Sequence, residues 1–445
     1  MRNSNYKKTI FSWSIYDFAN QPFTTITITF IYSVFFAEYI FLGSDYTGTD
    51  LERKIRISEG VAAWGTAVTI SSIIVALLSP IMGAIADRGG YRKIFLIFWT
   101  WVCIIFSFCL YYPTGGDIFY ALLFFCLANI GFEMGGVFLN AYLPEIAPKE
   151  KIGRISGYGW SFGYIGGLIA LAICFVLFAT PDSMFYNRLD NSTGEQYRII
   201  NIFIAIWFAV FSIPTFLYVK GKKKVNSDRK KIISNSFIAI KNTFGEIKKY
   251  KQVTRFLIAR IIYNDAIITV IAFGGQYAST QFGFNMENGK LMIFAIVLNV
   301  FAGVGSFLFG FLDDFIGGKK TVQITNVGFV IAILVAYIAP LLDNGETYFW
   351  ISGVMIGIFL GPNQSASRSL MGRLIPRNKE NEFYGFFAFS GKATAFLGPL
   401  IFTSIISYTK DIRLAMLMLA ILFIVGALLL RRVDTEEGIK VAQKF

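Results

Sequence analysis

The stretch GAIADRGGYRK, Gly83–Lys93, lies between two apolar segments and decides the fold, because a second copy of it occurs later in the chain. The copy is GFLDDFIGGKK, Gly310–Lys320, which repeats the first Gly, the central Asp and the two closing basic positions at an offset of 227 residues. A second pair of stretches, PKEKIGRISGYG from Pro148 and PRNKENEFYGFF from Pro376, matches at an offset of 228. Two matches at nearly the same offset indicate two parallel repeats in one chain.

The segments around these copies are strongly apolar. In the chain of 445 residues, apolar residues with Gly counted and Tyr left out make up about 59%, against roughly 45–50% in soluble domains, and only 16% of residues are charged. Many segments hold about 20 residues with few charges, which is enough to span the ~30 Å hydrocarbon core of a bilayer. We therefore expect an all-α, integral, multi-pass membrane protein, located in the cell inner membrane if its source is bacterial.

The apolar pattern predicts twelve transmembrane helices. Their ranges are about 11–41, 60–86, 92–111, 117–142, 153–179, 200–219, 253–280, 288–313, 320–341, 347–372, 383–408 and 411–431. With the N-terminus inside, the cytoplasmic segments hold 29 of the 41 Lys and Arg residues and the outer loops hold eight. Cytoplasmic loops carry such an excess, so both termini are expected in the cytoplasm. The same bias accounts for the formal charge of +13, and we expect no nucleic acid as a partner.

The basic run KGKKKVNSDRKK from Lys220 marks the middle of the chain. It separates an N-terminal six-helix bundle, 1–219, from a cytoplasmic linker, 220–252, and from a C-terminal six-helix bundle with a short cytoplasmic tail, 253–445. In the linker, apolar residues at helical spacing predict an amphipathic helix on the membrane surface, with a solvated helix as the alternative. These residues are Phe237, Ile240, Phe244 and Ile247.

Polar side chains within the spans concentrate in five of the predicted helices. The candidates for solute binding or proton coupling are Tyr16, Asp17, Asn20, Asn129, Glu133, Asn140, Arg260, Tyr263, Asn264, Asp265, Asn363, Gln364, Arg368 and Lys392. Asn129, Glu133 and Asn140 share one face of their helix, since a helix turns about 100° per residue. Arg260 and Asp265 lie about 140° apart on a regular helix, so both can face one cavity only if that helix is broken.

Two interpretations of these residues stay open. In the first, they line a water-filled central cavity that binds a polar or zwitterionic solute, and Asp17, Glu133 or Asp265 carries a coupling proton, because a low dielectric favours the neutral carboxyl group. In the second, they form structural ion pairs, such as Asp17–Arg260 or Glu133–Arg368, because buried charges are normally paired. The chain has no His, no metal-ligand pattern and no nucleotide-binding motif, so neither a metal nor a cofactor is expected.

The stretch GAIADRGGYRK resembles the loop motif of the major facilitator superfamily, Gly-x-x-x-Asp-Arg-x-Gly-x-Arg-Lys. Further stretches are similar to the branch that contains the autophagy-related vacuolar amino-acid effluxer and its bacterial relatives: SWSIYDFANQPF, FLNAYLPEIA, RISGYGWSFGYIGG, GPNQSASRS and FFAFSGKATAFLGP. The resemblance implies the major facilitator fold, alternating access and amino-acid efflux. It also implies that an inner gate is held closed by charge pairs and by the end of a neighbouring helix, through Asp87, Arg88 and Arg92, with Asp314 in the second copy. The alternative for this stretch is a basic loop that only determines topology.

We therefore expect a secondary active transporter that moves a small polar solute across a membrane by alternating access, and not an enzyme. An amino acid is the first candidate solute, efflux is the first candidate direction, and coupling to protons is a hypothesis drawn from the three carboxylates. The expected partners are the solute, the lipid bilayer and protons, and the chain is expected to act as a monomer. The alternative is a membrane sensor or scaffold that keeps the transporter fold and binds its ligand without moving it.

Overall fold

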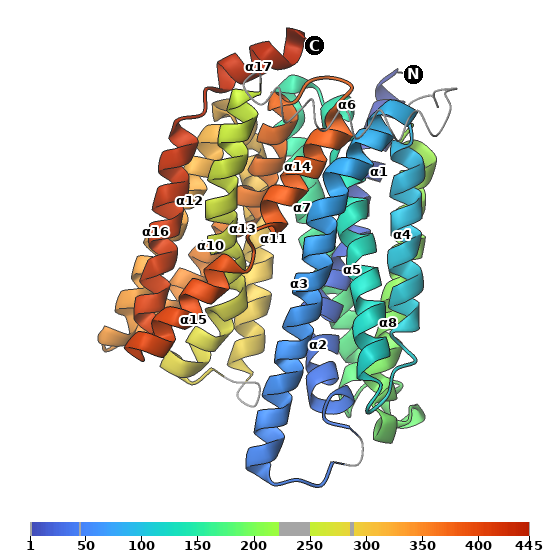
Figure 1. Ribbon diagram of the computed structural model, residues 1–445, viewed down its shortest axis with the longest axis vertical. Coiled ribbons are helices and arrows are strands. Elements are labelled where there is room, and N and C mark those ends of the chain that lie inside the picture. Colours follow the sequence, from blue (N-terminus) through green and yellow to red (C-terminus); the bar gives the residue numbers. More distant parts are fainter. Residues whose placement is uncertain (1, 44–45, 222–249, 285–288, 445) are drawn as a thin grey trace. The chain divides into compact units, whose positions relative to one another are not determined.

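The computed structural model describes residues 2–43, 46–221, 250–284 and 289–444, with side chains from residue 5 onward. Every regular element in this part is a helix (Figure 1). The first half contains α1 (Arg2–Pro22), α2 (Tyr32–Phe35), α3 (Asp50–Gly89), α4 (Arg92–Cys109), α5 (Ile118–Asn140), α6 (Leu143–Ile146), α7 (Ile152–Cys174) and α8 (Glu195–Tyr218). The second half contains α10 (Lys251–Phe282), α11 (Lys290–Ile316), α12 (Gly318–Ile338), α13 (Gly345–Leu374), α14 (Glu380–Lys392), α15 (Leu397–Thr409), α16 (Ile412–Arg431) and α17 (Thr435–Lys444).

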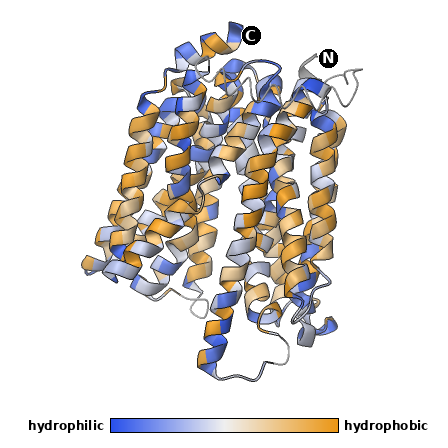
Figure 2. Cartoon of the chain, viewed as in Figure 1, coloured by the Kyte–Doolittle hydropathy of each residue, from blue (hydrophilic) through white to orange (hydrophobic). Residues whose placement is uncertain are grey.

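Eleven helical stretches of the described part are long and apolar enough to cross a membrane. Hydrophobic residues cover most of their length, and hydrophilic residues gather near their ends (Figure 2). Helix α13 is not among the eleven although it has 30 residues, because it contains the polar stretch GPNQSASRS. The crossing of α13, the count of twelve and the cytoplasmic position of both termini therefore stay predictions.

Three helices differ from their expected ranges, each for a local reason. Helix α3 begins at Asp50, about ten residues before the predicted start, because acidic residues in its first turn and good helix formers extend it beyond the apolar stretch. The first span changes after Pro22 into a π-helix, Phe23–Phe30, where a proline and a run of β-branched residues weaken the α-helical pattern. The predicted helix 383–408 is interrupted by a turn at 393–396, between α14 and α15.

The chain divides into two compact units. The first comprises Met1–Val75, Tyr91–Leu139 and Phe162–Lys222, and the second comprises Ala76–Gly90, Asn140–Ser161 and Lys223–Phe445. The last turns of α3, the segment after α5 and the start of α7 therefore pack with the second half of the chain. The division into two six-helix bundles stays a prediction. The predicted linker, 220–252, with its amphipathic helix, falls almost wholly on residues 222–249, outside the described part.

Each unit has its own close helix contacts. In the first, α8 packs against α1 and α4, and Nε1 of Trp13 donates a hydrogen bond to the backbone oxygen of Leu139 at 2.9 Å. In the second, α13 packs against α11 and α12, and α10 packs against α16. The backbones of α11 and α13 come close at Gly305, where a Cβ would overlap the carbonyl oxygen of Ile358. Small residues at such contacts let helices pack tightly in a membrane, where burial of apolar surface gives little driving force.

Candidate functional site

Asp87 lies in the last turn of α3, and its carboxylate caps the first turn of α14. Its Oδ1 accepts the backbone N–H of Asn381 at 3.2 Å and the Nδ2 of the same residue at 2.6 Å, and its Oδ2 accepts the backbone N–H of Glu382 at 2.8 Å. The first N–H groups of a helix have no partner within it and form the positive end of its dipole, so a carboxylate suits them. Gly83, one turn earlier, permits the approach, because a Cβ there would overlap the carbonyl oxygen of Asn381.

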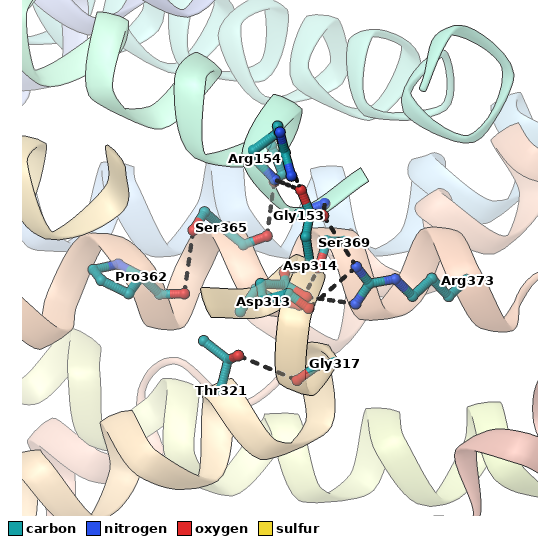
Figure 3. Close-up of polar contacts among 12 residues, drawn as sticks. Gly153, Arg154, Asp313, Asp314, Gly317, Thr321, Pro362, Ser365, Ser369 and Arg373 are labelled. Atoms are coloured by element: carbon teal, nitrogen blue, oxygen red, sulfur yellow. Dashed lines mark hydrogen bonds and ion pairs between the residues drawn. The ribbon is translucent and has the colours of Figure 1, made fainter. Parts of the chain in front are cut away.

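Asp314, at the equivalent position of the second copy, caps the first turn of α7 in the same way (Figure 3). Its Oδ1 accepts the backbone N–H of Gly153 at 2.7 Å, and its Oδ2 accepts the backbone N–H of Arg154 at 3.3 Å. The Nε of Arg154 also donates to Oδ2 at 2.5 Å, and Nη2 of Arg373 lies 3.5 Å from Oδ1. We call these two contacts, Asp87 with α14 and Asp314 with α7, the double cap.

The two parts of the double cap are related by the repeat found in the sequence. Asp87 and Asp314 are 227 residues apart, and the capped residues Gly153 and Asn381 are 228 apart. Each repeat therefore supplies a carboxylate to a helix of the other repeat, which is the reciprocal pattern of a twofold relation. The aspartates were predicted from the sequence, whereas the two capped turns were not.

Asp313 is a buried carboxylate that is absent from the candidates predicted from the sequence. It forms an ion pair with Arg373 and accepts a hydrogen bond from the hydroxyl of Ser369, and both partners lie on α13 (Figure 3). Arg373 thus links Asp313 to its neighbour Asp314. The doubled aspartate in GFLDDFIGGKK, at the end of an apolar helix, was the signal available for this residue.

The other two predicted gating residues take different positions. Arg88 is exposed at the end of α3, in the second unit. Arg92 is buried as the first residue of α4 and belongs to the first unit. The structure therefore brings Asp87, Arg88 and Asp314 into one unit, and the role of Arg92 at a gate stays a prediction.

Arg368, on α13, donates from all three guanidinium nitrogens to the segment Asn140–Ser161. Its Nε and Nη2 donate to Oγ and to the backbone oxygen of Ser156 at 2.9 and 2.6 Å, and its Nη1 donates to Oδ1 of Asn140 at 3.1 Å. The residue is only 4% exposed. Asn140 and Arg368 are separated by 228 residues, the repeat offset, so this hydrogen bond joins two equivalent positions.

A connected polar cluster surrounds the end of α14. The Nη1 of Arg260 donates to the backbone oxygen of Phe387 and to Oγ of Ser390, both at 2.9 Å, and the guanidinium group lies 3.7 Å from the centre of the Phe387 ring. Beside it, Oδ1 of Asn264 accepts a hydrogen bond from Nε2 of Gln364 at 3.2 Å. Three predicted residues therefore meet here. Arg260 and Asn264 are buried, whereas Gln364 is half-buried and so remains partly accessible.

Asp265 faces a different element from Arg260. Its Oδ2 accepts the backbone N–H of Gly398 at 2.9 Å, in the first turn of α15, while its buried Oδ1 has no hydrogen-bond partner in the described part of the chain. The carboxylate therefore caps the helix that begins after the turn at 393–396, which stabilises the restart of the helix at that place. Lys392, the last residue of α14, is half-buried next to this turn.

Two further candidates of the second half take part in helix packing. The Oη of Tyr263 and Oγ of Ser367 are 2.8 Å apart, and both residues are buried. The Nδ2 of Asn363 donates to Oγ1 of Thr325 at 2.9 Å and to Oδ1 of Asn326 at 2.8 Å, both on α12. Asn363 therefore points to α12, whereas its neighbour Gln364 contacts α10.

The candidates of the first unit are all enclosed to some degree. Tyr16 is buried, and its Oη lies 2.6 Å from Oγ1 of Thr100. Nδ2 of Asn129 donates to Oγ of Ser71 at 2.7 Å. Of the other candidates here, Asn20 is buried, and Asp17 and Glu133 are half-buried. The ion pairs predicted between the two halves join residues of different units and stay predictions.

The chain is similar to known proteins over most of its length. A family model described as "Vacuole effluxer Atg22 like" matches residues 65–443. An uncharacterised MFS-type transporter of Bacillus subtilis, YxiO, is 28% identical over 97% of this chain and 96% of its own length. Autophagy-related protein 22 of Yarrowia lipolytica is 24% identical over 71% of this chain and 56% of its own length, so the chain spans little more than half of that fungal relative.

Solved structures of major facilitator transporters have the same fold. The proton:xylose symporter XylE aligns with 98% of this chain and 97% of its own at a TM-score of 0.75 and 12% identity. The transporter FucP, in its outward conformation, aligns with 96% of this chain and 98% of its own at a TM-score of 0.68 and 12% identity. These two likenesses concern the fold and carry no information on the solute. The match over residues 65–443 shows that the chain belongs to the Atg22-like family, a branch of the major facilitator superfamily, and it is an integral, multi-pass secondary transporter.

Proposed function

We propose that the chain moves a small polar solute by alternating access, with an amino acid as the first candidate and efflux as the first candidate direction. The double cap carries this proposal, because it ties helices of the two repeats together through a few hydrogen bonds made by Asp87 and Asp314. Alternating access needs contacts between the repeats that form and break as a set at one end of the molecule. The double cap would then close the inner gate, on the predicted cytoplasmic side.

Proton coupling is a second part of the proposal, with Asp17, Glu133 and Asp265 as candidate proton sites. Ionisable groups within spans are costly and usually functional. Asp265 supports the idea best, because it is buried with one carboxylate oxygen on the N–H of Gly398 and the other without a partner among the described residues. A proton on that second oxygen would remove a charge from a dry environment and leave the cap on α15 in place.

Flux into proteoliposomes tests both parts. Vesicles that contain the purified chain should accumulate amino acids from a labelled mixture when a pH gradient is imposed, and a protonophore should abolish the accumulation. The triple variant D17N/E133Q/D265N should keep downhill exchange and lose gradient-driven uptake. Gradient-driven uptake that survives in the triple variant would exclude these carboxylates as coupling sites. Binding of amino acids without any flux would favour the alternative, a sensor that keeps the transporter fold.

A further inference from the structure

The Nε–Nη2 edge of Arg368 meets two oxygens of a single residue. Ser156 supplies its hydroxyl oxygen to Nε at 2.9 Å and its backbone oxygen to Nη2 at 2.6 Å. Both of these acceptors on the Nε–Nη2 edge are neutral oxygens. Two parallel N–H···O bonds from one edge of a guanidinium group are the arrangement in which arginine usually binds a carboxylate. Ser156 thus occupies the place that two carboxylate oxygens would fill.

The hydroxyl of Ser156 is held in that place by α13 itself. Its Oγ donates to the backbone oxygen of Ser365 at 2.7 Å, three residues before Arg368 on the same helix. The lone pairs of Oγ therefore point to Nε of Arg368, and the hydroxyl acts as an acceptor there. The arrangement spans two helices of different repeats, α7 and α13, and it breaks as soon as α7 moves away from α13.

Ser156 lies one turn beyond the residues that Asp314 caps. Gly153 and Arg154 hold the start of α7 to α11 through the double cap, so opening of the cap would release the same turn that carries Ser156. Arg368 would then lose two neutral acceptors and present its Nε–Nη2 edge to the opened space. A solute carboxylate would bind this edge more strongly than Ser156 does, because its negative charge attracts the guanidinium group in addition to accepting the two hydrogen bonds, whereas the oxygens of Ser156 are neutral.

We propose that Arg368 binds the carboxylate of the transported solute when the gate is open, and that Ser156 substitutes for this carboxylate when the gate is closed. The inference deepens the proposed function and rests on it. The solute class is then a small molecule with a free carboxylate, and Arg368 determines this preference. By linkage, a carboxylate that binds only the open state shifts the chain toward that state. Ser156 is accordingly a competitor built into the chain, and its removal favours the solute.

Binding to the purified full-length chain tests the inference. The probes are an equimolar mixture of proteinogenic amino acids and the matching mixture of amino-acid amides, which lack the charged carboxylate. The wild-type chain should show a rise in unfolding temperature with the acids and little with the amides. In R368Q the preference for acids over amides should fall about tenfold or more, and R368K should keep part of it, because lysine retains the charge without the fork.

Ser156→Ala keeps the backbone oxygen and loses the hydroxyl acceptor, so it should raise the affinity for the acids about two- to tenfold. Ser161→Ala is the matched control, because Oγ of Ser161 donates to the backbone oxygen of Gly303 at 2.7 Å and so joins the same helix to α11 without contacting Arg368. An equal rise in S156A and S161A would mean a looser gate and would overturn the competitor role. Equal binding of acids and amides by the wild-type chain would overturn the inference and leave the proposed function standing. If neither mixture binds, an amino acid is the wrong solute and both fall.

Discussion

Asp87 and Asp314 occupy equivalent positions in the two repeats, yet their surroundings differ. As a residue Asp314 is half-buried, with its side chain 4% exposed, and it lies between two guanidinium groups, those of Arg154 and Arg373. Asp87 is half-buried, and its carboxylate receives two backbone N–H groups and the side-chain amide of Asn381. Both carboxylates cap a helix of the other repeat through two backbone N–H groups, to which two guanidinium groups are added at Asp314 and the side-chain amide of Asn381 at Asp87. The two repeats therefore share the geometry of the capping contact but differ in the side chains that support it.

Asp314→Asn should have the largest effect on the double cap. Removing one partner of a buried ion pair costs roughly 3–5 kcal/mol, and because Arg154 is 32% exposed we expect the lower end, about 3 kcal/mol. Hydrogen exchange should therefore speed up strongly in the first turn of α7 and much less in the first turn of α14. Unchanged exchange in α7 would mean that the ion pairs do not stabilise this cap.

Asp87→Asn should act on the other helix. The amide keeps one acceptor oxygen and loses the charge at the helix N-terminus, which costs up to about 2 kcal/mol. Exchange should speed up at Asn381 and Glu382 and stay near the wild-type rate at Gly153. If D87N and D314N each loosened both helices equally, the two caps would open only together, and their different donors would not give them different local stabilities.

Gly83→Ala and Gly310→Ala probe the steric side of the comparison. A Cβ at Gly83 would overlap the backbone oxygen of Asn381, whereas a Cβ at Gly310 would lie 2.9 Å from Cα of Arg154. Overpacking costs roughly 1–3 kcal/mol, and we expect Gly83→Ala to lower stability by about 1 kcal/mol more than Gly310→Ala. Thermal unfolding of the two purified variants measures the difference. A larger loss of stability in Gly310→Ala would show that the backbone around Gly310 adjusts less easily to an added methyl group.

Ser79→Ala and Ser306→Ala should give the smallest effect. The two serines are equivalent by the repeat, but Oγ of Ser79 donates to the backbone oxygen of Gly385 at 3.0 Å, while the buried Oγ of Ser306 has no partner in the described part of the chain. Loss of the first hydrogen bond should cost about 0.5–1 kcal/mol, and loss of the second hydroxyl should be nearly neutral. Equal unfolding temperatures of the two variants would contradict this asymmetry.

The sequence predicted the repeat, most helix ranges and the aspartates of the double cap, because each leaves a local pattern of apolar runs, charges or spacing. It could not identify the capped turns, because the acceptor Asp87 and the donor Asn381 are 294 residues apart and the donors are backbone N–H groups. The break before α15 was missed for a similar reason, since Asp265 that caps α15 lies on α10. Solute binding, proton coupling and gating by the candidate residues stay predictions.

The hydrogen bond between Arg368 and Asn140 has a consequence for how far the two repeats can resemble each other. A side chain at the centre of a twofold arrangement meets its own counterpart, so arginine at both positions would press two guanidinium groups together, and like charges in contact repel. Asparagine at position 140 removes this repulsion and supplies an acceptor instead. In a chain with two identical repeats, an arginine at this position would face a second arginine. An arginine near the twofold axis therefore requires a different residue at the equivalent position of the other repeat.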